Sequence, residues 1–79
     1  MKIRLQYYAV LRDERGLDEE TRQTGARTPR ELYQELKSGG FLHFDARFIR
    51  PARNDRFCDW DEVLAENDLV VFVPPVSGG

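Results

Sequence analysis

Apolar and polar side chains alternate along residues 2–8, and this alternation predicts a strand with one buried face. The residues expected to face the core are Ile3, Leu5 and Tyr7. Residues 69–73 form a continuous apolar run after a turn signal at 67–68, and they predict a second, more deeply buried strand. Because these are the most apolar strand segments of the chain, we expect them to lie side by side at the centre of a sheet.

The segment that starts at Thr28 carries the sharpest helix signal. We expect the Thr28 hydroxyl to accept a hydrogen bond from the Glu31 N–H, and the Glu31 carboxylate to reach back to the Thr28 N–H, as in a capping box. Pro29 takes the first helical position, where its missing N–H costs nothing. The apolar residues behind it share one face and are Leu32, Tyr33 and Leu36. The glycine pair at 39–40 predicts the end of this helix.

The segments on either side of this helix give weaker signals. Residues 9–18 predict a turn or a short irregular piece, with a break at Gly16. Residues 19–24 predict a polar strand at an edge of the sheet. A third strand is expected to begin at residues 48–49, and Pro51 indicates that this strand lies at an edge or carries a bulge.

A hairpin and a long connection complete the expected sheet. Asn54 and Asp55 tolerate the left-handed backbone conformation and predict a hairpin turn, from which a return strand begins at Phe57. Residues 59–66 predict a connection that packs Val63 and Leu64 under the sheet.

The resulting order is strand, strand, helix, strand, strand, strand. This is an α+β pattern in which one main helix packs on one face of a mixed sheet, and it predicts the β-grasp, or ubiquitin-like, architecture. At 79 residues the chain forms one small domain. We expect the β-grasp domain to span residues 1–73 and residues 74–79 to project from it as an extended C-terminal Gly-Gly tail.

The sheet face away from the helix is expected to carry an apolar patch. If Val70 and Phe72 face the core, their neighbours along the strand point outward. The residues expected on this outward patch are Tyr8, Phe57, Val71 and Val73. An exposed apolar patch beside a functional segment is typical of an interface with a partner. The alternative is that a loop covers the patch.

Composition narrows the classes of partner. The net charge of −2 gives no electrostatic case for nucleic acid or for a membrane surface. The single cysteine excludes an internal disulfide and fits a cytoplasmic protein. We see neither a signal-peptide pattern after Met1 nor an apolar run long enough to cross a bilayer.

The last six residues are the strongest candidate for chemistry. Two prolines follow the final strand directly, and because proline lacks an N–H they predict a stiff arm that leaves the sheet. The residues expected to thread into a partner are Pro74, Pro75, Val76, Ser77 and Gly78. Glycines have no Cβ and enter slots that exclude other residues, so the Gly79 carboxylate is the expected reactive group. The alternative is that the glycine pair is only a frayed end.

Other polar residues are weaker candidates. His43 has no second His or Cys at metal spacing, so no metal site is expected. Cys58 is more typical of a small apolar strand residue than of a nucleophile. A charged connection contains Asp59, Asp61 and Glu62. A basic stretch is typical of a solvated strand edge rather than a phosphate site, although it can also steer an acidic partner, and it contains Arg47, Arg50, Arg53 and Arg56.

Taken together, these segments resemble the small, sulfur-carrying subunits of molybdopterin synthase, a branch of the ubiquitin-like sulfur carriers. The resemblance covers nearly the whole chain and rests on Tyr-Tyr-Ala-Val-Leu-Arg at 7–12, Thr-Pro-Arg-Glu-Leu at 28–32, Ala-Arg-Asn at 52–54 and the segment 67–79. Thiamine-pathway carriers usually lack the double proline before Gly-Gly. Two residues depart from the pattern: Arg53 replaces an apolar residue, which bears on how its strand packs, and Asn67 replaces a glycine.

The resemblance implies a sequence of reactions at Gly79. An E1-like enzyme adenylates its carboxylate with ATP, and a sulfur donor displaces AMP to leave a nucleophilic thiocarboxylate. The large catalytic subunit, in a heterotetramer with this one, then directs the sulfur to the cyclic pyranopterin monophosphate precursor of the molybdenum cofactor. The domain itself is expected to bind no cofactor and to supply no acid, base or metal.

Two alternatives stay open. In the first alternative the chain is a sulfur carrier for another pathway, such as thiamine synthesis or tRNA thiolation, or a ubiquitin-like modifier of lysines. In the second alternative it is a non-catalytic β-grasp interaction module with an inert tail. The Pro-Pro spacer favours the molybdopterin branch over other carriers.

Overall fold

The first and last strands pair in parallel at the centre of the sheet, as the sequence predicts. In the computed structural model, which describes residues 1–75, β1 (Lys2–Gln6) lies beside β5 (Leu69–Val73), with Leu5 opposite Val70. Both strands bury every second side chain, because one face of the sheet is covered and the other is not.

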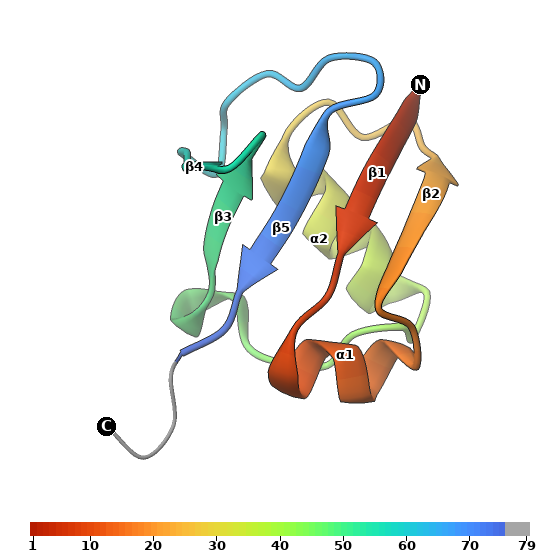
Figure 1. Cartoon of the computed structure of the whole chain (residues 1–79), viewed down its shortest axis with the longest axis vertical. Coiled ribbons are helices and arrows are strands. Elements are labelled where there is room, and N and C mark those ends of the chain that lie inside the picture. Colours follow the sequence, from red (N-terminus) through yellow and green to blue (C-terminus); the bar gives the residue numbers. More distant parts are fainter. Residues whose placement is uncertain (76–79) are drawn as a thin grey trace.

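Three further strands flank this pair. β2 (Glu19–Gln23) runs antiparallel to β1, β3 (Arg50–Arg53) runs antiparallel to β5, and β4 (Arg56–Phe57) forms a hairpin with β3. The strand order is β2-β1-β5-β3-β4, and Figure 1 shows the sheet with its helices behind it and at its lower end. This topology is the ubiquitin-like β-grasp, an α+β fold, and the predicted edge position of β2 is confirmed.

The main helix, α2 (Pro29–Ser38), begins where the sequence predicts. Thr28 Oγ1 accepts a hydrogen bond from the Glu31 N–H at 3.2 Å, and Pro29 takes the first position. The Glu31 carboxylate, however, accepts from the Arg27 N–H at 2.8 Å rather than from that of Thr28. With Thr28 extended (φ −135°, ψ 160°), the N–H one residue earlier is the donor within reach. Within residues 1–75 no helix has the length and apolar content needed to cross a bilayer.

The prediction of an irregular segment over residues 9–18 is wrong. Ala9–Arg15 form a second helix, α1. β1 ends at Gln6, two residues earlier than predicted, and the chain turns after the extended Tyr8, at Ala9 with φ 50°. Tyr8 gives this helix no side-chain cap, so the usual N-terminal signal is missing. The helix is held instead by burial of Leu11 and by a left-handed Gly16, whose N–H bonds the Arg12 carbonyl.

The third strand begins later than predicted. Residues Ala46–Phe48 form a 3₁₀ turn, η1, which Asp45 caps, and β3 starts only at Arg50. Pro51 lies in β3, which has β5 on one side and β4 on the other, so the prediction of an edge strand is wrong. The Pro51 carbonyl accepts a hydrogen bond from the Cys58 N–H. Because the N and C=O of one strand residue point to the same side, the Pro51 nitrogen also faces β4. The ladder with β4 involves only the two residues after Pro51, so no ladder partner needs its missing N–H.

The turns and the connection agree with the sequence except at one residue. Asn54, Asp55 and Asn67 all adopt positive φ, at 51°, 71° and 67°, as predicted for the hairpin and for the turn before β5. Leu64 is buried as expected, but Val63 is 69% exposed, so its predicted burial is wrong.

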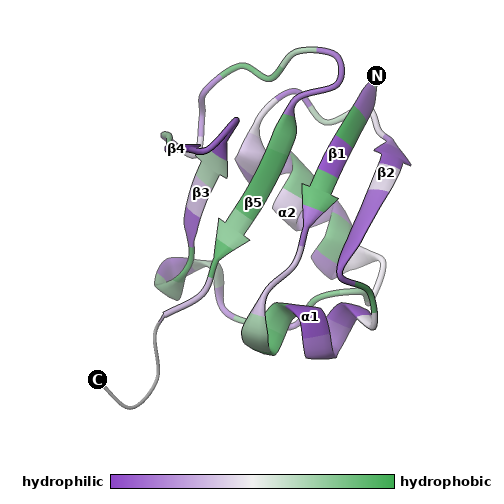
Figure 2. Cartoon of the chain, viewed as in Figure 1, coloured by the Kyte–Doolittle hydropathy of each residue, from purple (hydrophilic) through white to green (hydrophobic). Residues whose placement is uncertain are grey.

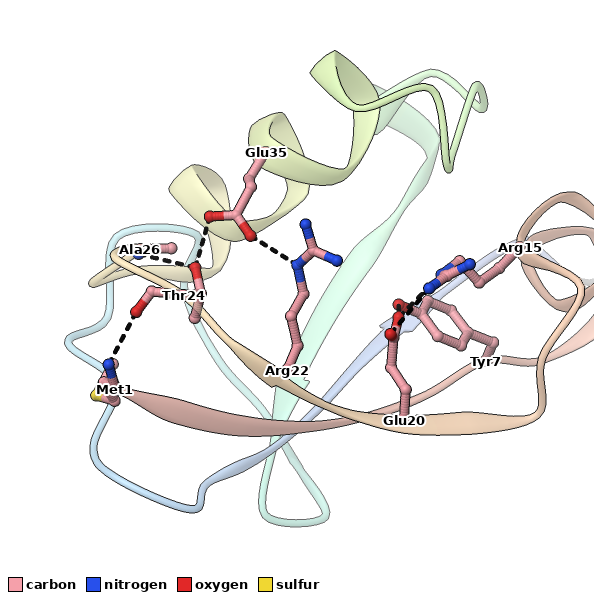
Figure 3. Close-up of polar contacts among 8 residues, drawn as sticks. All are labelled: Met1, Tyr7, Arg15, Glu20, Arg22, Thr24, Ala26 and Glu35. Atoms are coloured by element: carbon pink, nitrogen blue, oxygen red, sulfur yellow. Dashed lines mark hydrogen bonds and ion pairs between the residues drawn. The ribbon is translucent and has the colours of Figure 1, made fainter.

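Polar contacts attach the helices to the edge strand β2 (Figure 3). Glu20 accepts a hydrogen bond from the Tyr7 hydroxyl and a bidentate pair from Arg15 of α1, the latter with both distances at 2.9 Å. Glu35 of α2 accepts from Arg22 at 2.7 Å and from Thr24 at 2.6 Å. Charged hydrogen bonds to both helices therefore add to the backbone ladder with β1 in holding a strand of little apolar content.

Candidate functional site

The tail leaves the sheet at the end of a central strand. β5 ends at Val73, whose partner across the sheet is Arg50, and Pro74 and Pro75 lie outside the sheet. The predicted end of the strand at the prolines is therefore confirmed. Pro74 is buried and Pro75 exposed, so the arm starts from a fixed point. The remaining residues named for the tail, Val76, Ser77, Gly78 and Gly79, lie outside the described residues.

One face of the sheet has no helix over it, and we call it the outer face. Figure 2 shows the hydrophobic ribbon of β5 running through its middle. A shallow depression of about 250 Å³ lies on this face, lined by Gln6, Tyr8, Ala52, Asp55, Phe57, Val71 and Val73. The structure thus brings together all four side chains that the sequence places on the outward patch. Their contact with a partner stays a prediction.

The aromatic residues at the two sides of this depression are open to solvent. Tyr8 is 52% exposed and Phe57 is 56% exposed, so no loop among residues 1–75 covers the patch. The Tyr8 hydroxyl donates to Gln6 Oε1 at 2.9 Å, and the Arg50 guanidinium lies over the Phe57 ring. Large exposed apolar side chains gathered on one face are a feature of interaction surfaces rather than of ordinary monomer surface.

Sequence reasoning missed Arg50 and Ala52 as members of this face. Their position follows from the register, because directly opposed residues on neighbouring strands share a face: Ala52 is opposite Val71, and Arg50 is opposite Val73. The signal was available in the alternation of residues 50 and 52 along β3. It was obscured because the start of this strand was expected two residues earlier.

Arg53, one of the two residues that depart from the pattern of the resembled family, has a defined role. Its Nε donates to Asp68 Oδ2 at 2.6 Å, and another of its nitrogens donates to Glu62 at 3.0 Å. Asp68 also accepts from the Ala65 N–H at 2.7 Å and from Asn54 at 3.0 Å. Burial alone would raise the pKa of Asp68, but these hydrogen bonds and the arginine charge hold it below its usual value. The network joins the β3–β4 hairpin to the start of β5.

The weaker candidates show no reactive geometry. His43 is exposed, and no group of three His, Cys, Asp or Glu side chains within residues 1–75 is placed to hold a metal ion. Cys58 is half-buried, and burial raises the pKa of its thiol, which disfavours the nucleophilic thiolate. Asp61 forms a bidentate pair with Arg30 at 2.8 and 3.1 Å.

Comparisons with known proteins point to one family. A sequence model of the ThiS family matches residues 5–79. Among solved structures, a putative molybdopterin converting factor, subunit 1, from Pyrococcus furiosus is 32% identical, with a TM-score of 0.76 over 96% of this chain and 99% of that chain. No curated protein sequence matches the chain significantly.

Two more distant structures share the fold. SAMP1 from Haloferax volcanii is 21% identical, with a TM-score of 0.78 and full coverage of both chains. A complex of subunits 1 and 2 of the molybdopterin-converting factor from Helicobacter pylori contains a chain that is 21% identical, again with full coverage of both chains and a TM-score of 0.72. That complex shows a chain of this fold bound to a partner subunit.

Proposed function

Since the chain belongs to the ThiS family and has the β-grasp fold of the ubiquitin-like sulfur carriers, we propose that it is the sulfur-carrier subunit of a molybdopterin synthase. The Gly79 carboxylate is the group that carries the sulfur. The large synthase subunit receives the tail, and the outer face with Tyr8, Phe57, Val71 and Val73 is the surface against which that subunit docks.

The chemistry requires activation of an unreactive carboxylate. An E1-like enzyme transfers AMP from ATP to the Gly79 carboxylate and releases pyrophosphate. A sulfur donor then attacks the acyl carbon, AMP leaves, and a thiocarboxylate remains, ionised and nucleophilic at neutral pH. In the synthase the sulfur passes to the cyclic pyranopterin monophosphate precursor, and two such rounds provide the two sulfurs of the dithiolene. The domain positions one reactive atom, and its partners supply the catalytic groups.

The observation that carries the proposal is the arrangement at the end of β5. A strand in the middle of the sheet is followed directly by two prolines, and an apolar, solvent-exposed face lies at the same point. The similarity to the Pyrococcus protein at 32% identity supports the molybdopterin assignment. The similarity to SAMP1, at 21% identity, concerns the fold alone. It therefore gives the alternative of a protein modifier less support than the Pyrococcus protein gives the molybdopterin assignment.

The proposal is tested by intact mass and reconstitution. The chain is incubated with ATP, an E1-like activating enzyme and a sulfur donor, and its mass should rise by the exchange of one oxygen for sulfur. The thiocarboxylated chain, mixed with the large synthase subunit, should then convert the pyranopterin precursor to molybdopterin. A chain that gains no sulfur is an interaction module. A chain that gains sulfur but gives no molybdopterin serves another thiolation pathway.

A further inference from the structure

A single arginine lies on the outer face at the base of the tail. Arg50 opens β3 and is directly opposite Val73, the last residue of β5. Because opposed residues of antiparallel strands share a face, the Arg50 side chain lies beside the apolar depression. Pro74 follows Val73 at once, so Arg50 is next to the point where the tail leaves the sheet.

Phe57 orients this arginine. The guanidinium carbon of Arg50 lies 3.8 Å from the centroid of the Phe57 ring, and both residues are exposed. A guanidinium held over the face of a ring leaves the N–H groups around its edge free to bind an oxygen ligand. The stack therefore presents a hydrogen-bond donor edge beside an apolar surface.

The charge of Arg50 is not matched within residues 1–75. Two of its neighbours in the basic stretch have acidic partners there: Arg47 pairs with Asp45 at 3.1 Å, and Arg53 pairs with Glu62 and Asp68. Arg50 forms no ion pair with any side chain of the described residues. An arginine stacked in place without a carboxylate is suited to bind one from outside the domain.

We propose that Arg50 binds an Asp or Glu carboxylate of the large synthase subunit, next to the apolar contact at Val73. This ion pair makes the outer face specific for a partner that has a carboxylate at that position. The inference rests on the proposed function and adds the chemistry of the partner surface. Docking on the outer face removes water from Arg50, and a charge that loses water without gaining a partner is strongly unfavourable. A protein with an apolar surface alone is thereby rejected, whereas one with a carboxylate opposite Arg50 is accepted.

The test is a charge series at Arg50 with a matched control at Arg56. Arg56 is also an exposed arginine without an ion pair among the described residues, but it is opposite Arg53 and so lies on the other face of the hairpin from Phe57. Calorimetric titration measures binding of each variant to the large synthase subunit. We expect Arg50→Ala and Arg50→Glu to weaken binding at least about 30-fold, and Arg56→Glu less than about 3-fold. Arg50→Lys should also bind more weakly than wild type, because lysine cannot form the bidentate pair.

The outcomes separate this inference from the proposed function. If the chain accepts sulfur and the Arg50 variants bind the large subunit as wild type does, the inference is overturned and the function stands. Equal losses for Arg50→Glu and Arg56→Glu indicate only a general charge effect and also overturn it. If sedimentation shows that the free chain dimerises and that Arg50→Glu makes it monomeric, the occupant is a second copy and the inference fails. If wild type gains no sulfur and does not bind the large subunit, both proposals fail.

Discussion

Replacing Asp68 with asparagine should destabilise the fold in a way that depends on pH. Asp68 Oδ2 accepts from Arg53 at 2.6 Å and from the Ala65 N–H at 2.7 Å, while Oδ1 accepts from Asn54 at 3.0 Å. Asparagine keeps the shape but turns one acceptor into a donor, so at least one of these donors loses its acceptor.

The magnitude follows from the hydrogen bonds to the charged carboxylate. Such bonds contribute about 1.5–3 kcal/mol, against a total stability of about 4–12 kcal/mol for a chain of this size. At about 4–8 °C per kcal/mol, Asp68→Asn should lower the melting temperature by roughly 6–24 °C at pH 7.

The pH dependence gives the sharper test. Because the folded pKa of Asp68 is depressed, its contribution is present above the unfolded pKa and is lost as the pH falls through the folded pKa. The difference in melting temperature between wild type and variant should stay constant from neutral pH to about 5 and narrow below about 4. Thermal melts followed by circular dichroism measure it, with Asp13→Asn, at an exposed position in α1, as the control. A difference that does not narrow in acid would mean that the carboxylate charge is not what stabilises the hairpin.

Three further predictions concern the helix, the outer face and the tail. Thr28→Ala should cost about 0.5–2 kcal/mol through loss of the N-cap, and an unchanged urea midpoint would contradict it. Val73→Asp should abolish binding to the large synthase subunit while leaving the melting temperature of the free domain nearly unchanged, since the charge stays in water until the face is covered; Tyr8→Ala should have a milder effect. Titration calorimetry and melts decide both, and normal binding of Val73→Asp would place the interface elsewhere. Gly78→Val or deletion of Gly79 should abolish sulfur transfer in the reconstituted synthase without altering the circular dichroism spectrum, and an active variant would refute the role of the tail.

The main helix and the central strands were predictable because their signals are local and agree with one another. Thr28 and Pro29 specify a helix start, and Leu5 and Val70 occupy alternating positions that only one register of a half-covered sheet can bury. Asn54 and Asp55 likewise encode their hairpin through tolerance of positive φ.

The errors fall where tertiary contacts override a weak local signal. α1 has seven residues and no side-chain cap, and a helix of that length is not stable by itself. It exists because Leu11 is buried in the core and Arg15 pairs with Glu20 of the neighbouring strand. Val63 and Leu64 are both apolar in sequence, and the contact that accompanies burial of Leu64, a hydrogen bond from its N–H to the Arg27 carbonyl, joins residues far apart in the chain that local pattern does not connect.

The parallel pairing of β1 and β5 explains why the candidate interface and the tail lie together. Parallel strands end at the same edge of a sheet, so Tyr8, two residues beyond the end of β1, is brought level with the end of β5 at Val73. β3 runs the other way, so its first residue, Arg50, reaches that same edge. Strand pairing alone thus brings residues far apart in sequence to the point where Pro74 leaves the sheet. Under the proposed function, we therefore expect a partner that takes the tail to meet an aromatic ring, an apolar strand end and a positive charge in the same contact.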